Sequence, residues 1–399
     1  MSKGWSEQVK VGLIEEMPPW LLDSKFLLTG HRFPQSFKSL SISLFTKHNQ
    51  TMNIWTHLLG AFFFCWVVFW IFTASLMADN IANTLKENLI SYQFENHFEK
   101  FSSSFLSPIF ENFHHESLDD FKDKYTEAMT NFNSIVPFPL SIQPHFETFQ
   151  KVIREEAVFA MKSTNSSEFI LKCHQPSIFF ENLVVHSSKL IELFPVYVFA
   201  ASAIVCLLCS SIYHLYSPLS PFWFRVLRKM DYSGICLNIP SSTFAYLYYL
   251  FYCHDTLRNV YVYGMFTIGI VVFIFNNLPL FEARKFKPIR VTLFAILGFS
   301  NVIPVVHGMY FSLFSSPESY ILPLGKHTVY HIAQLFCYLI GIFFYVSHFP
   351  EKHFPKKFDI WLNSHTIWHV CVFLGMYCCW MAIWHTLVAR LEIRCGYCQ

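Results

Sequence analysis

The stretch Asn363-Ser-His365-Thr-Ile-Trp-His369-Val370 opens the last long apolar run of this chain and sets two histidines four residues apart. On a helix, side chains at that spacing lie on the same face. Two imidazoles on one face of a rigid helix can bind one divalent cation, and neutral imidazole is a common ligand of zinc. The stretch therefore predicts half of a metal site, and other parts of the chain must supply the remaining ligands.

The amino-acid composition indicates the class of protein in which such a site would lie. Apolar residues make up 53% of the 399 residues, aromatic residues 19% and charged residues only 14%. These values are typical of a polytopic membrane protein and exclude an ordinary soluble domain. The formal net charge is +2 with no basic tract, so no nucleic-acid partner is expected. The 12 cysteines are scattered, which favours packing residues over a disulfide framework.

Runs of about twenty apolar residues predict an all-α membrane protein, a seven-transmembrane helix bundle. The predicted spans cover residues 54–77, 193–215, 231–252, 258–278, 290–313, 328–347 and 366–388. The corresponding organisation is a cytosolic N-terminal segment (1–52), a first helix (53–77), an outer insert (78–192), six further helices (193–390) and an outer C-terminal tail (391–399).

The distribution of basic residues predicts the orientation. The loops after the second, fourth and sixth spans are rich in them: Arg225, Arg228, Lys229, Arg284, Lys285, Lys287, Arg290, Lys352, Lys356 and Lys357. The short loops on the other side hold few, Arg258 and Lys326. Because basic loops stay on the cytosolic side, the amino terminus is expected in the cytosol and the carboxyl terminus outside or in the lumen. Arg390 and Arg394, beyond the last span, weigh mildly against this orientation.

The insert of about 110 residues between the first two spans is too long for an ordinary connection. We expect a small domain on the outer side of the membrane. Its sequon, Asn165-Ser-Ser167, would be glycosylated only on the non-cytosolic face, and an unmodified asparagine is the alternative.

Ionisable side chains inside spans are costly and mark function by default. In the predicted orientation five of them come to the cytosolic ends of four helices: His57, His214, Asp231, His365 and His369. Three other histidines fall near the opposite face: His307, His331 and His385. A lone histidine in a membrane helix usually satisfies an interhelical hydrogen bond, but a cluster at one depth favours a metal.

A zinc site follows from this cluster. His214, His365 and His369 together with a water would complete a tetrahedral zinc that keeps one open position, as catalytic sites do. Asp231 could hold that water or orient an imidazole. Ser210, one turn before His214, lies on the same helix face and could donate to the same water.

Four motifs in this chain resemble those of the progestin and adipoQ receptor family, the adiponectin-receptor-like proteins. They are Asn53-Ile-Trp-Thr-His57-Leu-Leu-Gly60, Ser210-x-x-x-His214, Asp231-Tyr-Ser-Gly-Ile235 and Ser364-His365-x-x-x-His369. The resemblance runs from about Gly30 to His385, without the insert. It implies a seven-helix receptor fold with a cytosolic amino terminus, and a zinc held by the three matching histidines. It also implies a relationship to membrane hydrolases such as alkaline ceramidases, and a ceramide-hydrolysing activity.

Two details qualify the resemblance. Local motifs such as Phe349-Pro-Glu-Lys-His-Phe-Pro355 are most similar to a Golgi-resident branch of the family that tethers Raf kinase, so both plasma membrane and Golgi or another endomembrane are expected. The family usually has an acidic residue three positions before Asn53, where this chain has Gln50. Any role that depends on that carboxylate is therefore in doubt.

Two functions from different classes remain open. In the first, a zinc hydrolase cleaves a lipid amide such as ceramide, with Asp231 as general base and Ser210 stabilising the developing oxyanion. In the second, a receptor or scaffold uses zinc only to join helices, and binds an extracellular ligand or a cytosolic signalling protein. The same three histidines serve both functions.

Overall fold

The computed structural model of the chain describes residues 9–22, 24–91, 192–314 and 322–392. Two compact units are present, one formed by residues 1–72 with 191–399 and the other by residues 73–190. Of the second unit the described residues form the end of one helix. Most of the predicted outer insert, with Asn165, lies outside the described residues.

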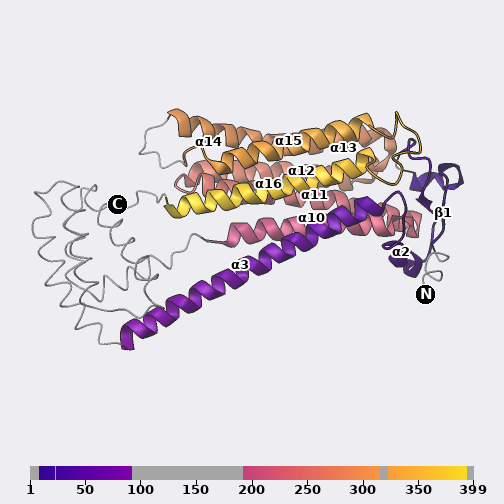
Figure 1. Cartoon of the computed structure of the whole chain (residues 1–399). Coiled ribbons are helices and arrows are strands. Elements are labelled where there is room, and N and C mark those ends of the chain that lie inside the picture. Colours follow the sequence, from indigo (N-terminus) through magenta and orange to yellow (C-terminus); the bar gives the residue numbers. More distant parts are fainter. Residues whose placement is uncertain (1–8, 23, 92–191, 315–321, 393–399) are drawn as a thin grey trace, which may run out of the picture. The chain divides into compact units, whose positions relative to one another are not determined.

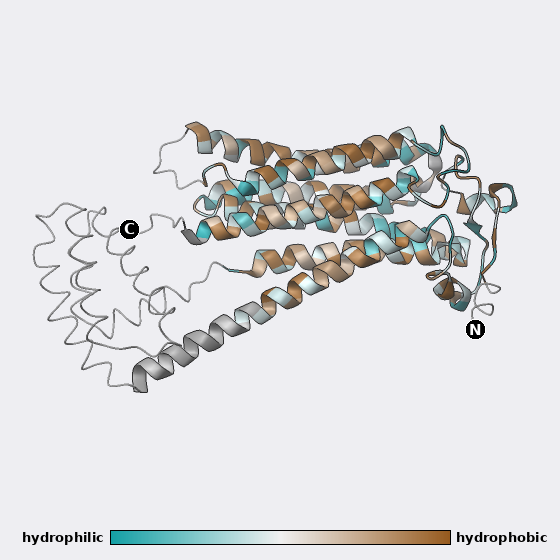
Figure 2. Ribbon diagram, viewed as in Figure 1, coloured by the Kyte–Doolittle hydropathy of each residue, from teal (hydrophilic) through white to brown (hydrophobic). Residues whose placement is uncertain are grey.

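The first unit is a bundle of long helices (Figure 1). Its helices are α3 (Thr51–Ser91, of which the first part belongs to this unit), α10 (Phe194–Tyr216), α11 (Pro221–Leu250), α12 (Asp255–Asn277), α13 (Lys287–Ser300), α14 (Val302–Phe314), α15 (Lys326–Ser347) and α16 (Ser364–Glu392). The most extensive helix pairs are α15 with α16, α10 with α11, and α11 with α12. Figure 2 shows the apolar residues spread along these helices, as expected of surfaces that face lipid.

Six helical segments are long and apolar enough to cross a membrane. They are residues 51–73, 194–219, 255–277, 287–314, 326–347 and 364–390. The third predicted span, residues 231–252, is helical as part of α11 but does not belong to this set. Its sequence mixes Asp231, Asn238 and the run Ser241-Ser-Thr243 with apolar residues, so its average hydropathy is low. It is nevertheless a member of the bundle, because α11 packs between α10 and α12.

The segment that forms the fifth predicted span is divided into α13 and α14 at Asn301. Pro304 explains the interruption, because it lacks the N–H that would bond to the carbonyl of Ser300. The two pieces together still have the length of one membrane crossing.

The core lies where the first part of α3 meets α10, α11 and α16. Phe64 of α3 packs edge-to-face on Phe199 of α10, with ring centroids 5.5 Å apart, and both side chains are fully buried. Gly60 of α3 lies against Phe373 of α16, where an added Cβ would come within 2.8 Å of the ring. Close packing of this kind, rather than exclusion of water, holds membrane helices together.

Residues 9–50 form an N-terminal cap at the end of the bundle where α10 ends and α16 begins (Figure 1). The cap contains an antiparallel pair of short strands, two 3₁₀ turns and one short helix. They are β1 (Val11–Gly12), η1 (Ile14–Glu16), η2 (Pro19–Leu21), β2 (His31–Arg32) and α2 (Phe37–Ser43). We call this end of the bundle the triad end.

Buried polar contacts fix the cap to the bundle. The Arg32 guanidinium, only 2% exposed, donates to the carbonyl of Leu215 at 2.9 Å and also to that of His214. Burial lowers the pKa of Arg32 to about 9, so the group stays charged at neutral pH. On the other side Asp359, in the α15–α16 loop, accepts hydrogen bonds from the backbone N–H and the hydroxyl of Thr29, both at 2.8 Å.

Candidate metal centre

Three imidazoles converge at the triad end. His214 lies in the last turn of α10, and His365 and His369 lie in the first turns of α16. The Nε2 atom of His365 is 3.3 Å from Nε2 of His214 and 3.2 Å from Nε2 of His369. Among the described residues these three form the one group with the composition and spacing to hold a metal ion.

The spacing fits zinc. With Zn–N distances of 2.0–2.1 Å, a tetrahedral ion places two ligand nitrogens about 3.3 Å apart. The Nε2 pairs at 3.2 and 3.3 Å match this value, and all three ligand atoms lie within 4.8 Å of one another. The structure thus brings together the three histidines that the sequence predicted as ligands.

The start of α16 is fixed by two polar side chains. Asn363 caps the helix, because its Oδ1 accepts from the backbone N–H of Thr366 at 2.9 Å. Glu351, 2% exposed, accepts from the backbone N–H of Ser364 at 2.7 Å and from its hydroxyl at 2.5 Å. Burial by itself raises the pKa of Glu351, but hydrogen bonds from His348 and Ser364 outweigh it and hold this pKa below its ordinary value. The turn that carries His365 is therefore held in place from outside the helix.

Sequence reasoning missed Glu351 as a site residue. The only sequence signal was its place in the Phe349-Pro-Glu motif, close before the histidine stretch.

Gln50, at the N-terminal start of α3, orients His214. Its Oε1 accepts from Nδ1 of His214 at 2.8 Å and from Nδ2 of Asn53 at 2.8 Å. Asn53 in turn accepts, through Oδ1, from the hydroxyl of Thr366 at 2.7 Å. Because the amide oxygen can only accept, Nδ1 of His214 carries the proton and Nε2 presents its lone pair. The residue that departs from the family pattern is thus in direct contact with a candidate ligand.

His57 lies beside the triad, as the sequence placed it. Its ring stacks on that of His369 with centroids 3.8 Å apart. Both its nitrogens are buried and have no hydrogen-bond partner within the described parts of the chain. It is not one of the converging ligands, so its visible role is to pack against the His369 ring.

Ser210 and Asp231 lie outside the converging group. Ser210 is buried on α10, one turn before His214. Asp231 of α11 is half-buried and interacts electrostatically with Cys206 and Cys209 of α10. Asp231 therefore faces α10 at about the level of Ser210.

The three histidines expected at the opposite face lie apart from the triad. His307 bonds to the hydroxyl of Tyr261 at 2.7 Å. His331 stacks on Tyr246, and His385 stacks on Tyr330, with centroids 4.7 and 5.4 Å apart. These rings have packing partners of their own and serve as controls for the metal site.

Known proteins resemble this chain over most of its length. The family described as haemolysin-III related (HlyIII) matches residues 170–380. The heptahelical transmembrane protein ADIPOR3 of Oryza sativa is 28% identical over 378 residues, which cover 94% of this chain and 90% of that protein. The progestin and adipoQ receptor-like protein 1 of Caenorhabditis elegans is 25% identical over 407 residues, 99% of this chain and 65% of the relative. The adiponectin receptor protein of Drosophila melanogaster is 26% identical over 372 residues, 93% and 58% of the two chains.

These matches confirm the family resemblance read from the four motifs, and they agree with the apolar helices in indicating a multi-pass membrane protein. Since the family match covers more than half of the chain, this protein belongs to the haemolysin-III-related family, alongside the adiponectin-receptor-like and progestin and adipoQ receptor-like proteins.

Proposed function

We propose that this chain is a seven-helix, zinc-binding receptor-type protein of the plasma membrane or an endomembrane that hydrolyses a lipid amide such as ceramide. The observation that carries the proposal is the convergence of three imidazole nitrogens from two helices. Three protein ligands leave the fourth position of a tetrahedral zinc open, which is the arrangement of catalytic sites.

His214, His365 and His369 would hold the metal through their Nε2 atoms. A bound zinc would supply Lewis-acid chemistry, polarising the amide carbonyl of the substrate.

Asp231 and Ser210 would take part in the proton transfers and hydrogen bonds of the reaction. A carboxylate oxygen of Asp231 would take a proton from the attacking water and pass it to the leaving amine nitrogen. The Ser210 hydroxyl would donate to the oxyanion that develops on the carbonyl oxygen. Water adds to the carbonyl carbon and the C–N bond breaks, so the products are a fatty acid and an amine.

The burial of the triad favours a substrate that arrives from the bilayer. His214 and His369 are 3% and 2% exposed, and the cap is fixed next to His214 through Arg32. A lipid can enter between helices, whereas a water-soluble substrate would first have to displace the cap.

In the proposed topology α11 crosses the membrane in addition to the six apolar segments, which makes seven spans. The amino terminus is in the cytosol and the carboxyl terminus is outside. Cys253, next to the end of α11 far from the triad, supports it. Cys253 is disulfide-bonded, and disulfides persist in oxidising compartments.

A second candidate function is a non-catalytic scaffold that tethers a signalling kinase, with structural zinc. It is favoured by the position of Asp231, which faces Cys206 and Cys209 and is not in the converging group. In this case the N-terminal cap would bind the kinase.

Elemental analysis of the purified full chain tests the metal. We expect about one zinc per chain, and loss of zinc in His214→Ala, His365→Ala and His369→Ala. His385→Ala is a matched control on the same helix as two of the ligands, and His307→Ala is a control on another helix. Undiminished zinc in His214→Ala, or loss in His385→Ala, would show that the ligands are misassigned.

Release of fatty acid from ceramide by purified protein separates the two functions. A hydrolase loses activity in Asp231→Asn and in Ser210→Ala while zinc is largely retained. A scaffold contains zinc but shows no release above that of His369→Ala protein.

A further inference from the structure

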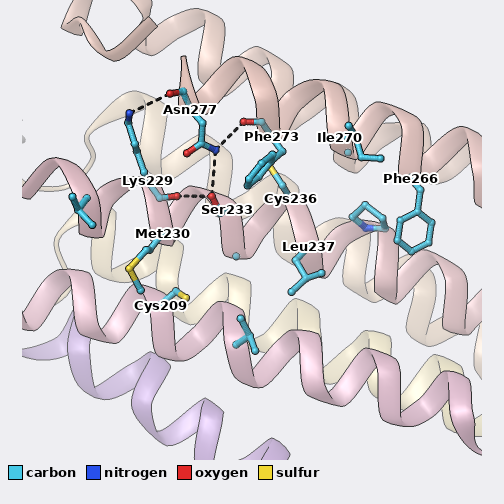
Figure 3. A pocket seen from close by; sticks show the side chains of 15 residues that line it. Cys209, Lys229, Met230, Ser233, Cys236, Leu237, Phe266, Ile270, Phe273 and Asn277 are labelled. Atoms are coloured by element: carbon cyan, nitrogen blue, oxygen red, sulfur yellow. Dashed lines mark hydrogen bonds between the residues drawn. The ribbon is translucent and has the colours of Figure 1, made fainter. Parts of the chain in front are cut away.

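A groove of about 650 Å³ lies between α10, α11 and α12, outside the metal centre (Figure 3). Its walls are mostly apolar side chains, among them Met230 and Leu237 of α11 and Phe266, Ile270 and Phe273 of α12. Volumes of this size are typical of small-molecule sites. The groove is open on one side, and Leu237 and Ile270 are 44% and 57% exposed at its rim. In a membrane-spanning bundle this opening faces lipid.

Two glycines let the helices approach closely beneath the groove. A Cβ on Gly269 of α12 would come within 2.7 Å of the Pro240 ring, and one on Gly234 of α11 within 2.9 Å of the Cα atom of Cys206. The groove is therefore a fixed hollow between packed helices and not a gap that side chains close.

The length of the groove matches one leaflet. It extends along α11 from Val226 to Pro240, fourteen residue steps, which at 1.5 Å per step is about 21 Å. One leaflet of a bilayer, with its headgroup region, is about 20–22 Å thick. One acyl chain of a lipid in the leaflet at the triad end would fill it.

The end of the groove nearest the triad end is polar and basic. Lys229 is the single charged residue among those that line the groove, and its Nζ donates to the carbonyl of Asn277 at 3.1 Å. The Asn277 amide donates to the carbonyl of Phe273 at 2.9 Å, and the Ser233 hydroxyl donates to the carbonyl of Lys229 at 2.8 Å (Figure 3). Arg225, one turn before Lys229 on α11, is exposed. Positive charge thus stands where a lipid phosphate would lie.

We propose that this groove binds one anionic glycerophospholipid, with an acyl chain along Leu237 and Ile270 and the phosphate at Lys229 and Arg225. Basic residues at the membrane surface favour anionic lipids by about fivefold each, and basic pockets between helices bind such headgroups. This site is independent of the proposed hydrolysis, because its lining residues include none of the three histidines, Ser210 or Asp231.

Photolabelling of the purified full chain in nanodiscs tests the proposal. The probes are phosphatidylserine and phosphatidylcholine with the same diazirine-bearing acyl chain, and labelled peptides are mapped by mass spectrometry. We expect phosphatidylserine to label the segments 230–240 and 266–273 about 25-fold more than phosphatidylcholine does, about fivefold for each of Lys229 and Arg225.

Two variants with matched controls define the site. Leu237→Trp should fill the groove and reduce phosphatidylserine labelling there severalfold, whereas Ile274→Trp, an exposed α12 residue outside the lining, should not. Lys229→Gln should lower the preference for phosphatidylserine about fivefold. Arg228→Gln should keep most of the preference, because Arg228 packs on Phe224. Melting temperatures close to that of the wild type show that the variants are folded. If Leu237→Trp does not fold, the lipid preference of Lys229→Gln still tests the proposal.

Three results would overturn the proposal. Equal labelling by the two lipids in the wild type would exclude an anionic site. Labelling spread evenly over the exposed helix surfaces would mean annular lipid only. If the other exposed helix surfaces were labelled and the groove were not, another protein helix would cover the groove.

Discussion

His214 Nδ1 donates to Oε1 of Gln50 at 2.8 Å, although 164 positions separate the two residues in the chain. This bond fixes the tautomer of the imidazole and points its Nε2 at His365. Gln50 also accepts from Asn53, which accepts from Thr366 on the helix that carries the other two histidines. A single chain of hydrogen bonds thus joins α3, α10 and α16 around the candidate metal position.

The first prediction concerns Gln50. Gln50→Ala removes the acceptor that orients His214 and should weaken zinc binding about 10- to 100-fold. Gln50→Glu keeps the acceptor and adds charge, which strengthens the bond from the imidazole, so zinc should bind at least as tightly as in wild type. Competition with chelators of graded affinity measures both effects. Gln334→Ala, a buried glutamine on α15, is the control, and wild-type affinity in Gln50→Ala would contradict the proposed role.

The second prediction concerns Glu351. Glu351→Ala leaves the buried N–H of Ser364 without its acceptor, at a cost of about 1–3 kcal/mol. The free energy of unfolding should fall, and because the first turn of α16 carries His365, zinc affinity should fall with it. Thermal unfolding of the detergent-purified chain measures the first effect and chelator competition the second. Asp255→Ala should change neither, since Asp255 is 72% exposed in its pair with Arg258.

The third prediction is a pH dependence of the N-terminal cap. His48 is fully buried, its Nε2 donates to the carbonyl of Ser43 at 3.1 Å, and its Nδ1 accepts from the backbone N–H of Gln50. Burial, aided by the charge of Arg32, lowers the pKa of His48 to about 2. The neutral form thus stabilises the cap above the unfolded pKa of about 6.5, and this stability falls by up to about 1.4 kcal/mol for each pH unit below it.

Limited proteolysis of the cap measures this effect. Cleavage within residues 9–50 should accelerate from pH 7.5 to pH 5.5 in the wild type. His48→Gln keeps a donor and an acceptor but does not titrate, so its acceleration should be smaller. An identical pH profile in the two proteins would show that another group controls the cap.

The fourth prediction is the orientation in the membrane. A tag at Met1 should be protected in intact cells, and a tag after Gln399 should be exposed on the outer or luminal side. Glycosidase should lower the apparent mass of the wild type but not of Asn165→Gln. Two tags on the same side would rule out seven spans, and a glycan that depends on Asn49 would reverse the orientation.

The sequence by itself determined the local features. The spacing of His365 and His369 places both on one face of any helix they form, and the apolar runs define the spans, because both depend only on neighbours along the chain. The structure has helices at every predicted span, although α3 ends 14 residues beyond the predicted bound, α11 begins ten residues before it, and the fifth span is divided into α13 and α14. It also has both histidines in the first turns of α16.

Composition alone was not sufficient to identify α11 as a member of the membrane bundle. Its polar residues lower the average hydropathy below that of the six apolar spans, and its membership of the bundle follows from packing against α10 and α12. A helix that is covered by neighbouring helices can carry Asp231 and Asn238, because its polar groups need not face lipid.

Only the tertiary structure decided which distant groups meet. The bond from His214 to Gln50, the clamp of Glu351 on Ser364 and the stacking of His57 on His369 join residues on separate segments. Sequence periodicity reports which face of a helix a residue occupies but not which helix that face contacts. Helix packing and loop closure settle that choice, and they placed Gln50 rather than Asp231 on the His214 ring.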